Sequence, residues 1–100
     1  MRDYKQLERI EARLIILKAL AAQDDERMNS SMLRDEVAAF GIDRAREWIH
    51  EELKWMATMG VIIVHELHGI KIAQLTEKGA RHLRGAETVE GIRRASRPEV

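Results

Sequence analysis

The distribution of apolar residues in the first part of the chain predicts a long helix over residues 3–22. Apolar residues recur there at alternating intervals of three and four, which places their side chains on one helical face. The residues on this face are Leu7, Ile10, Leu14, Leu17 and Ala21. Ile15, Ile16 and Leu20 widen the face, so we expect this helix to be central or to contact a second chain as well.

A second helix is predicted after the charged segment 23–30, which interrupts the helical pattern with turn-forming residues. It begins at Ser30 or Ser31, where the side chain of Asn29 or Ser30 can accept hydrogen bonds from the first-turn N–H groups. Gly41 ends it, because glycine readily adopts the left-handed conformation that follows many helices. Its buried face is expected to contain Met32, Leu33, Val37 and Phe40.

A third helix follows after a very short connection. Asp43 is the expected N-cap, the helix runs from Arg44 to about Met59, and Gly60 stops it. Two helices joined by a short turn that contains a glycine are typical of a helix-turn-helix unit. The apolar side comprises Ala45, Ile49, Leu53 and Met56, extended by Trp48, Trp55 and Met59. Glu52 falls within that side, so its carboxylate needs a partner unless the apolar side continues into an interface.

The apolar spacing then changes to that of a β-hairpin. Residues 61–64 are all β-branched, which favours a strand, and His68-Gly69 predicts a tight turn. Residues 70–75 form the second strand, and Thr76 is a good N-cap for a short helix that Gly85 ends. The predicted order is helix, helix, helix, strand, strand, helix, which is a mainly α fold with a small β-hairpin.

The composition is that of one small folded domain. The chain has 100 residues, of which 45% are hydrophobic and 34% charged, with 17 basic and 17 acidic residues and no cysteine. The first residues are too charged for a signal peptide, and no apolar run is long enough to span a membrane. We therefore expect a cytoplasmic protein. Its core is small and its first helix unusually apolar, so a homodimer is also expected.

The last quarter of the chain is more basic than the rest. From Thr76 onward there are six Lys or Arg residues and four Glu, whereas the first 75 residues hold eleven basic and thirteen acidic residues. The residues after Gly85 are mostly polar and include two more helix breakers, Gly91 and Pro98. We therefore expect one domain over residues 1–85 and a flexible basic C-terminal tail over residues 86–100.

The second half of the chain resembles winged helix-turn-helix proteins, in which a Leu…Gly-hydrophobic junction, a two-stranded wing and a Leu-Thr-x-Lys-Gly segment follow one another. The matching residues are Leu53, Gly60-Val61-Ile62 and Leu75-Thr76-Glu77-Lys78-Gly79. The whole chain is most similar to the small winged-helix proteins of Mu-like transposable bacteriophages, often labelled ArsR-type regulators. The cues are the length, the helix order, the LTEKG segment, Arg84-Gly85, Gly91-Ile92-Arg93 and Arg97-Pro98. The resemblance implies a winged-helix fold and a phage-encoded DNA-binding protein that regulates transcription or acts as an accessory factor.

In a winged helix, the N-terminal half of the third helix enters the major groove of DNA. There Arg46 could read a guanine edge and Arg44 could hold a phosphate. Two features argue against this interpretation, since residues 43–59 hold three basic and four acidic residues and the wing tip carries Glu66 and His68. The residues expected to contact duplex DNA are Arg44, Arg46, His50 and Lys54 of the helix, Lys71 of the wing, and Arg93, Arg94 and Arg97 of the tail.

Two classes of function stay open at this point. One is a dimeric protein that binds duplex DNA, and the other is a protein-interaction or assembly module that turns its acidic third helix to a partner protein. His65 and His68 form an H-x-x-H pattern, but on a strand they would point to opposite faces, so no metal or other cofactor is expected. The sequence has no phosphate-binding loop and no supported catalytic triad, so an enzyme is not expected either.

Overall fold

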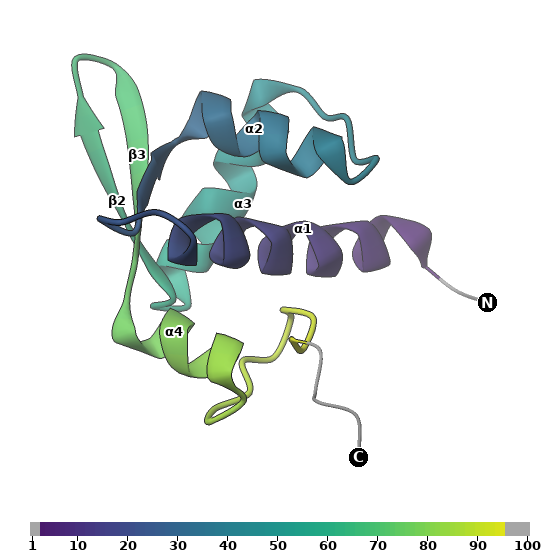
Figure 1. Ribbon diagram of the computed structural model, residues 1–100. Helices are drawn as coiled ribbons and strands as arrows, with labels where there is room; N and C mark the ends of the chain where they lie inside the picture. The colour runs from purple at the N-terminus through teal and green to yellow at the C-terminus, as the bar shows by residue number, and fades with distance from the viewer. Residues whose placement is uncertain (1–2, 96–100) are drawn as a thin grey trace.

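The computed structural model describes residues 3–95, which form four helices and a three-stranded antiparallel sheet (Figure 1). In chain order the elements are α1 (Tyr4–Ala21), β1 (Arg27–Asn29), α2 (Ser30–Ala39), α3 (Arg46–Thr58), β2 (Ile62–Leu67), β3 (Ile70–Leu75) and α4 (Glu77–Arg84). This order confirms the predicted mainly α fold with a hairpin. Strand β1 was not predicted, because its three residues lie in the segment that was expected to be a loop.

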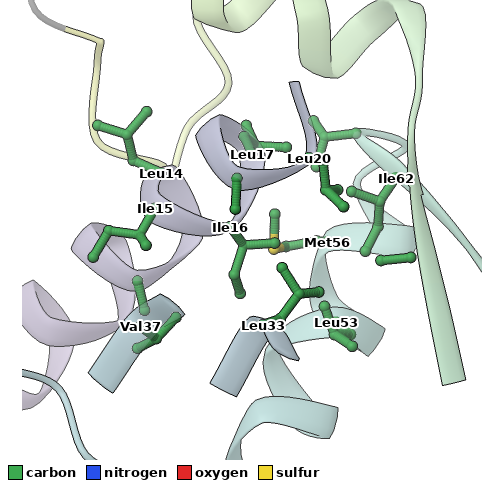
Figure 2. Packing of buried hydrophobic residues seen from close by; sticks show 14 of the residues in the cluster. Leu14, Ile15, Ile16, Leu17, Leu20, Leu33, Val37, Leu53, Met56 and Ile62 are labelled. Atoms are coloured by element: carbon green, nitrogen blue, oxygen red, sulfur yellow. The ribbon is translucent and has the colours of Figure 1, made fainter. Parts of the chain in front are cut away.

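Helix α1 is central, and its buried face contains Leu14 and Leu17 as predicted but is centred differently from the predicted face. The side chains of Ala12, Ile16 and Leu20, four residues apart, are fully buried because this side of α1 faces α2 and α3. Figure 2 shows Ile16 and Leu20 within the core formed by the three helices. Leu7 is 42% exposed and Ala21 is also exposed, so the predicted face was wrong at both ends. The residues that seemed only to widen the face in fact lie near its centre.

Helix α2 buries a narrower side than expected. Of the two predicted caps, Asn29 and Ser30, Asn29 is the one used, because its side-chain oxygen accepts a hydrogen bond from the Met32 N–H at 2.8 Å. Leu33 and Val37 are fully buried, as predicted, whereas Met32 is 50% and Phe40 69% exposed. The prediction for these two residues was wrong because the chain turns back after α2. Ile42 donates its backbone N–H to the Val37 oxygen at 3.3 Å and fills the core position expected for Phe40.

Helix α3 begins later than predicted. Its first residue is Arg46 and its N-cap is Ala45, which makes no side-chain capping bond. Asp43 is therefore not the N-cap. The difference is explained by the backbone oxygen of Arg44, which accepts a hydrogen bond from the Arg34 side chain at 2.7 Å. This contact with α2 holds the connection outside the helix.

The sheet has the order β1-β3-β2 and places a hairpin next to α3. We call the β2–β3 hairpin the wing. Its strands pair from Ile62 opposite Leu75 to Leu67 opposite Ile70. The turn residues His68 and Gly69 both have positive φ, at 52° and 78°, which is the pattern of the two-residue hairpin turn predicted from the sequence.

The Leu-Thr-Glu-Lys-Gly segment has a structural role. Thr76 caps α4 by accepting from the Gly79 N–H at 3.2 Å, and its hydroxyl donates to the Gly60 oxygen at 2.7 Å. Gly79 packs so closely that a Cβ there would collide with the Val61 backbone oxygen and the Leu75 side chain. The segment therefore holds α4 against the start of the wing, and the predicted α4 is confirmed.

Residues 86–95, which we call the C-terminal strap, pack on the domain instead of forming a tail. Val89 and Ile92 are each 4% exposed and belong to the core. The buried ring of His82 accepts from the Val89 N–H at 3.1 Å and contacts the Arg93 oxygen at 2.9 Å. These contacts explain why the tail predicted from residue 86 was wrong for this part, where two isolated apolar residues and one histidine were too weak a signal. The remainder of the predicted tail lies outside the described residues.

Within residues 3–95, no helix combines the length and the apolar character that a membrane crossing requires.

Candidate nucleic-acid interface

A buried ion cluster holds α3 on α1. The Glu52 side chain is 1% exposed, accepts a hydrogen bond from Arg13 Nε at 2.6 Å and also pairs with Arg9. This cluster gives Glu52 the partner that the sequence required. No buried side-chain nitrogen or oxygen in the described part of the chain lacks a hydrogen-bond partner. Helix α3 is therefore fixed by specific polar contacts as well as by apolar packing.

The two tryptophans of α3 belong to the same arrangement. The Arg9 guanidinium lies 5.1 Å from the Trp48 ring centre, and that of Arg13 lies 3.8 Å from the Trp55 ring centre. Arg13 also donates to the Gly91 oxygen of the strap at 2.8 Å. Both rings are half-buried and in contact with arginines, so they do not form the exposed aromatic surface that a tryptophan-mediated protein contact would need.

A surface groove of about 560 Å³ lies between the start of α2, the start of α3 and the wing. We call it the wing groove. Its polar lining comprises Asn29, Ser30, Ser31, Arg34, Arg46, His50, Glu66 and Lys71. Three of these side chains are permanently cationic and one is anionic, so the groove is basic although the chain has no net charge.

The groove continues along α3 into a second hollow of about 460 Å³. His50 and Lys71 line both hollows, and Lys54, Glu47 and Glu51 line the second one. Glu47 and Glu51 thus line the second hollow together with Lys54 and do not line the wing groove. Glu51 is also within 3.7 Å of Arg9, which offsets part of its charge.

The structure brings four of the predicted DNA-contacting residues to this surface: Arg46, His50, Lys54 and Lys71. Arg46 is exposed at the first turn of α3. Lys71 comes from β3 and pairs with Glu66 across the wing at 2.9 Å.

The other predicted residues lie elsewhere. Arg44 pairs with Glu8 of α1 and its guanidinium lies 5.9 Å from the Trp48 ring centre. Arg93 of the strap pairs with Glu11 at 2.6 Å, and Arg94 next to it is exposed. Arg97 lies outside the described residues.

His50 occupies the centre of the surface because it lines both hollows. One ring nitrogen lies 3.1 Å from the Ser30 hydroxyl at the start of α2. Partial burial lowers the pKa of His50 below its ordinary value of 6.5, and the positive charges of Lys71 and Arg46 lower it further. The imidazole is therefore neutral at pH 7 and ready to gain a proton if an anion enters the groove.

Sequence reasoning missed the contribution of α2. Arg34 extends the basic lining, and Asn29, Ser30 and Ser31 bring hydrogen-bonding groups to it. The sequence showed Asn29 and Ser30 only as helix caps. The sequence did contain a signal for this contribution. In a helix-turn-helix unit the polar N-terminus of α2 is expected to lie beside the start of α3, where DNA is contacted.

The histidines of the wing do not form a metal site with neighbours. His65 is exposed and its ring lies 2.8 Å from the side-chain oxygen of Gln74, while His68 is in the turn. Within the described residues there is no group of three or more His, Cys, Asp or Glu side chains that could hold a metal ion.

The comparison with known proteins gives one informative sequence relative. No family model matches the chain. The protein "Uncharacterized protein gp26" of Escherichia phage Mu is 30% identical over 82 residues, which cover 82% of this chain and 84% of gp26. The chain belongs to the family of phage Mu gp26. The expected likeness to Mu-like phage proteins is thereby confirmed, whereas the ArsR-type label stays a prediction.

A solved structure supports the fold of this gp26 relative. The present chain is similar to "F93 from STIV, a winged-helix DNA-binding protein", with a TM-score of 0.60 and 26% sequence identity. The similarity covers 73% of this chain and 79% of F93. The gp26 relative thus has a winged-helix fold, as its sequence predicted. The sequence predicted two strands of the small sheet, and β1 is the third strand, which was not predicted.

Proposed function

We propose that this gp26 relative binds duplex DNA through the wing groove, as a phage-encoded transcriptional regulator or accessory factor in the cytoplasm of a bacterial host. The observation that carries the proposal is the convergence of Arg34, Arg46 and Lys71 with His50 on one groove. These side chains come from α2, α3 and the wing, which are the elements that meet DNA in winged-helix proteins.

The groove fits the division of labour found in protein–DNA contacts. Arg46 is at the first turn of α3, where side chains reach base edges in the major groove. Its guanidinium can donate two parallel hydrogen bonds to a guanine. Arg34 and Lys71 flank it and are suited to phosphates. The Lys71–Glu66 pair is partly exposed, with the two side chains 31% and 57% exposed, and is worth about 1 kcal/mol, so Lys71 can exchange it for a phosphate.

The same geometry ranks the predicted contacts. Arg46, His50, Lys54 and Lys71, joined by Arg34, form the proposed DNA surface. Arg44 and Arg93 are engaged by glutamates of α1, so we assign them a structural role first. Arg94 and Arg97 stay predictions as a phosphate-contacting arm.

Two further arguments support the proposal. The structural neighbour F93 is described as a winged-helix DNA-binding protein and is 26% identical in sequence. Sequence-specific readers with one recognition helix per chain commonly bind as dimers to two half-sites, and we propose a homodimer here as well.

The proposal is tested with fluorescence anisotropy on labelled duplexes, first a random-sequence duplex and then duplexes selected from a random pool. The logarithm of the binding constant should fall linearly with the logarithm of the salt concentration. Arg46→Ala should weaken binding to a selected duplex by about 1–3 kcal/mol, which is at least about fivefold. Arg84→Ala is the matched control, because Arg84 is an exposed arginine on α4 outside the groove.

Equal losses for Arg46→Ala and Arg84→Ala would place the DNA contact outside the wing groove. The absence of binding to any duplex at low salt would overturn the proposal.

The second candidate function is a protein-interaction module, and one observation favours it. The wing carries three exposed apolar side chains, Ile63, Leu67 and Ile70, which are between 48% and 57% exposed. DNA has little use for such a surface, whereas protein interfaces bury apolar residues. This candidate predicts no duplex binding and a partner complex that Leu67→Ala weakens.

A further inference from the structure

The face of the domain opposite α3 carries a second groove, between α1 and α2. These helices lie in front of α3 and run in opposite directions (Figure 1). The groove has a volume of about 190 Å³ and a mainly apolar lining. Leu14 and Ile15 line it from α1, and Figure 2 shows Ile15 above Val37 of α2. We call it the α1–α2 groove.

The α1–α2 groove has a projecting aromatic residue at one end and small residues at the other. Phe40 lies at the C-terminal end of α2 and is 69% exposed. Ala19 and Ala22 line the groove near the C-terminal end of α1. Because α1 and α2 are antiparallel, the ring and the two alanines are at opposite ends. A cavity of about 150 Å³ is enough to hold benzene, so the groove is large enough for a phenyl ring.

Three charged residues line the groove: Glu11 and Lys18 of α1 and Glu36 of α2. Glu11 also pairs with Arg93 of its own chain at 2.6 Å. Glu11 and Lys18 lie seven residues apart on α1, which is about two helical turns. If a second α1 packs antiparallel with its twofold axis between Leu14 and Ile15, Glu11 of each copy lies opposite Lys18 of the other. The same axis brings Phe40 of each copy toward the end of the other copy's groove that Ala19 and Ala22 line.

We propose that the α1–α2 groove is the homodimer interface of this protein, with Phe40 of each copy inserted in the groove of the other. A twofold interface must be complementary to itself, and the ring, the alanines and the Glu11–Lys18 pair all meet that condition. An exposed phenylalanine seated in an apolar pocket is the kind of residue that dominates binding at an interface. The other exposed apolar residues of α1, Tyr4 and Leu7, continue the same helical stripe.

This inference specifies the dimer of the proposed function, but it does not depend on DNA binding. The α1–α2 groove and the DNA surface share no residue. Dimer formation and duplex binding can therefore be lost separately.

The test is sedimentation equilibrium of the full chain without DNA, over a concentration series, on the wild type and four variants. Phe40→Ala should raise the dimer dissociation constant at least about thirtyfold, which corresponds to the loss of one interface hot spot. Leu67→Ala is the matched control, because Leu67 is 57% exposed on the wing. Lys18→Glu should weaken the dimer by like-charge contact with Glu11, and Lys18→Glu combined with Glu11→Lys should restore most of it.

A wild type that stays monomeric throughout the series would overturn the inference. A dimer that Leu67→Ala weakens and Phe40→Ala does not would place the interface on the wing instead. Circular dichroism confirms the fold of each variant. Anisotropy with duplex DNA, run in parallel, shows whether a variant that no longer dimerises keeps the groove contacts of Arg46, so the two proposals fail separately.

Discussion

The buried ion cluster that holds α3 on α1 predicts a large loss of stability when the charge of Glu52 is removed. Glu52→Gln keeps the size of the side chain and one oxygen acceptor but removes the negative charge. Arg9 is 31% exposed and keeps much of its hydration, whereas the Arg13 side chain is 7% exposed and loses the carboxylate with which it pairs in the interior. Removing one partner of a buried pair costs about 3–5 kcal/mol. Because the amide oxygen still accepts, we expect the lower end, about 3 kcal/mol.

The control is Glu51→Gln, which makes the same chemical change one residue earlier. Glu51 is 68% exposed and 3.7 Å from Arg9, so its loss should cost less than about 1 kcal/mol. Urea unfolding followed by tryptophan fluorescence measures both values, since Trp48 and Trp55 contact the two arginines. The midpoint temperature of Glu52→Gln should fall by about 12–24 °C for a domain of this size. Equal stabilities for the two variants would refute the role given to the cluster.

Two further predictions concern the strap and the wing groove. Gly91 has φ +94°, and a Cβ there would lie 2.8 Å from the Trp55 ring, whereas a Cβ at Gly85, with φ +78°, would meet nothing within 4 Å. Chemical unfolding should therefore show a cost of about 1 kcal/mol for Gly85→Ala and about twice that or more for Gly91→Ala, and equal costs would contradict the close packing of the strap. Burial, and next to it the charge of Lys71, lower the pKa of His50 in the folded protein. The stability that neutral His50 contributes is therefore fully present above pH 6.5. It is lost as the pH falls from 6.5 through the lowered pKa of the folded state. A bound phosphate should raise the pKa of His50 and make duplex binding stronger as pH falls below 7. NMR titration of the His50 ring measures its pKa with and without duplex. An unchanged pKa would show that no phosphate approaches His50.

Much of the fold could be predicted because several helix ends and the hairpin turn carry a local signal, although the start of α3 does not. The Asn29 and Thr76 caps and the turn at His68-Gly69 depend on neighbouring residues, and all three were predicted correctly. The buried side of α1 could not be predicted in this way, since it depends on where α2 and α3 pack. Phe40 illustrates the same limit, because a phenylalanine at helical spacing looked like core until the chain turned back and buried Ile42.

The strap and the DNA surface show a second limit. Val89 and Ile92 are too few to form a pattern, and their burial depends on His82 and on α1. The proposed DNA surface gained Arg34 and lost Arg44 for the same reason. Arg34 is 12 positions from Arg46 in the sequence yet lines the same groove, while Arg44 is two positions away and is held by Glu8. Net charge counted along α3 therefore misrepresented the charge of the groove.

The central claim is that the wing groove is the DNA surface, and NMR mapping of ¹⁵N-labelled protein with a selected duplex tests it most directly. We predict chemical-shift changes centred on residues 29–34, on 46–54 and on Lys71, with α4 unaffected. Changes confined to the α1–α2 groove or the strap, or no changes at low salt, would contradict it.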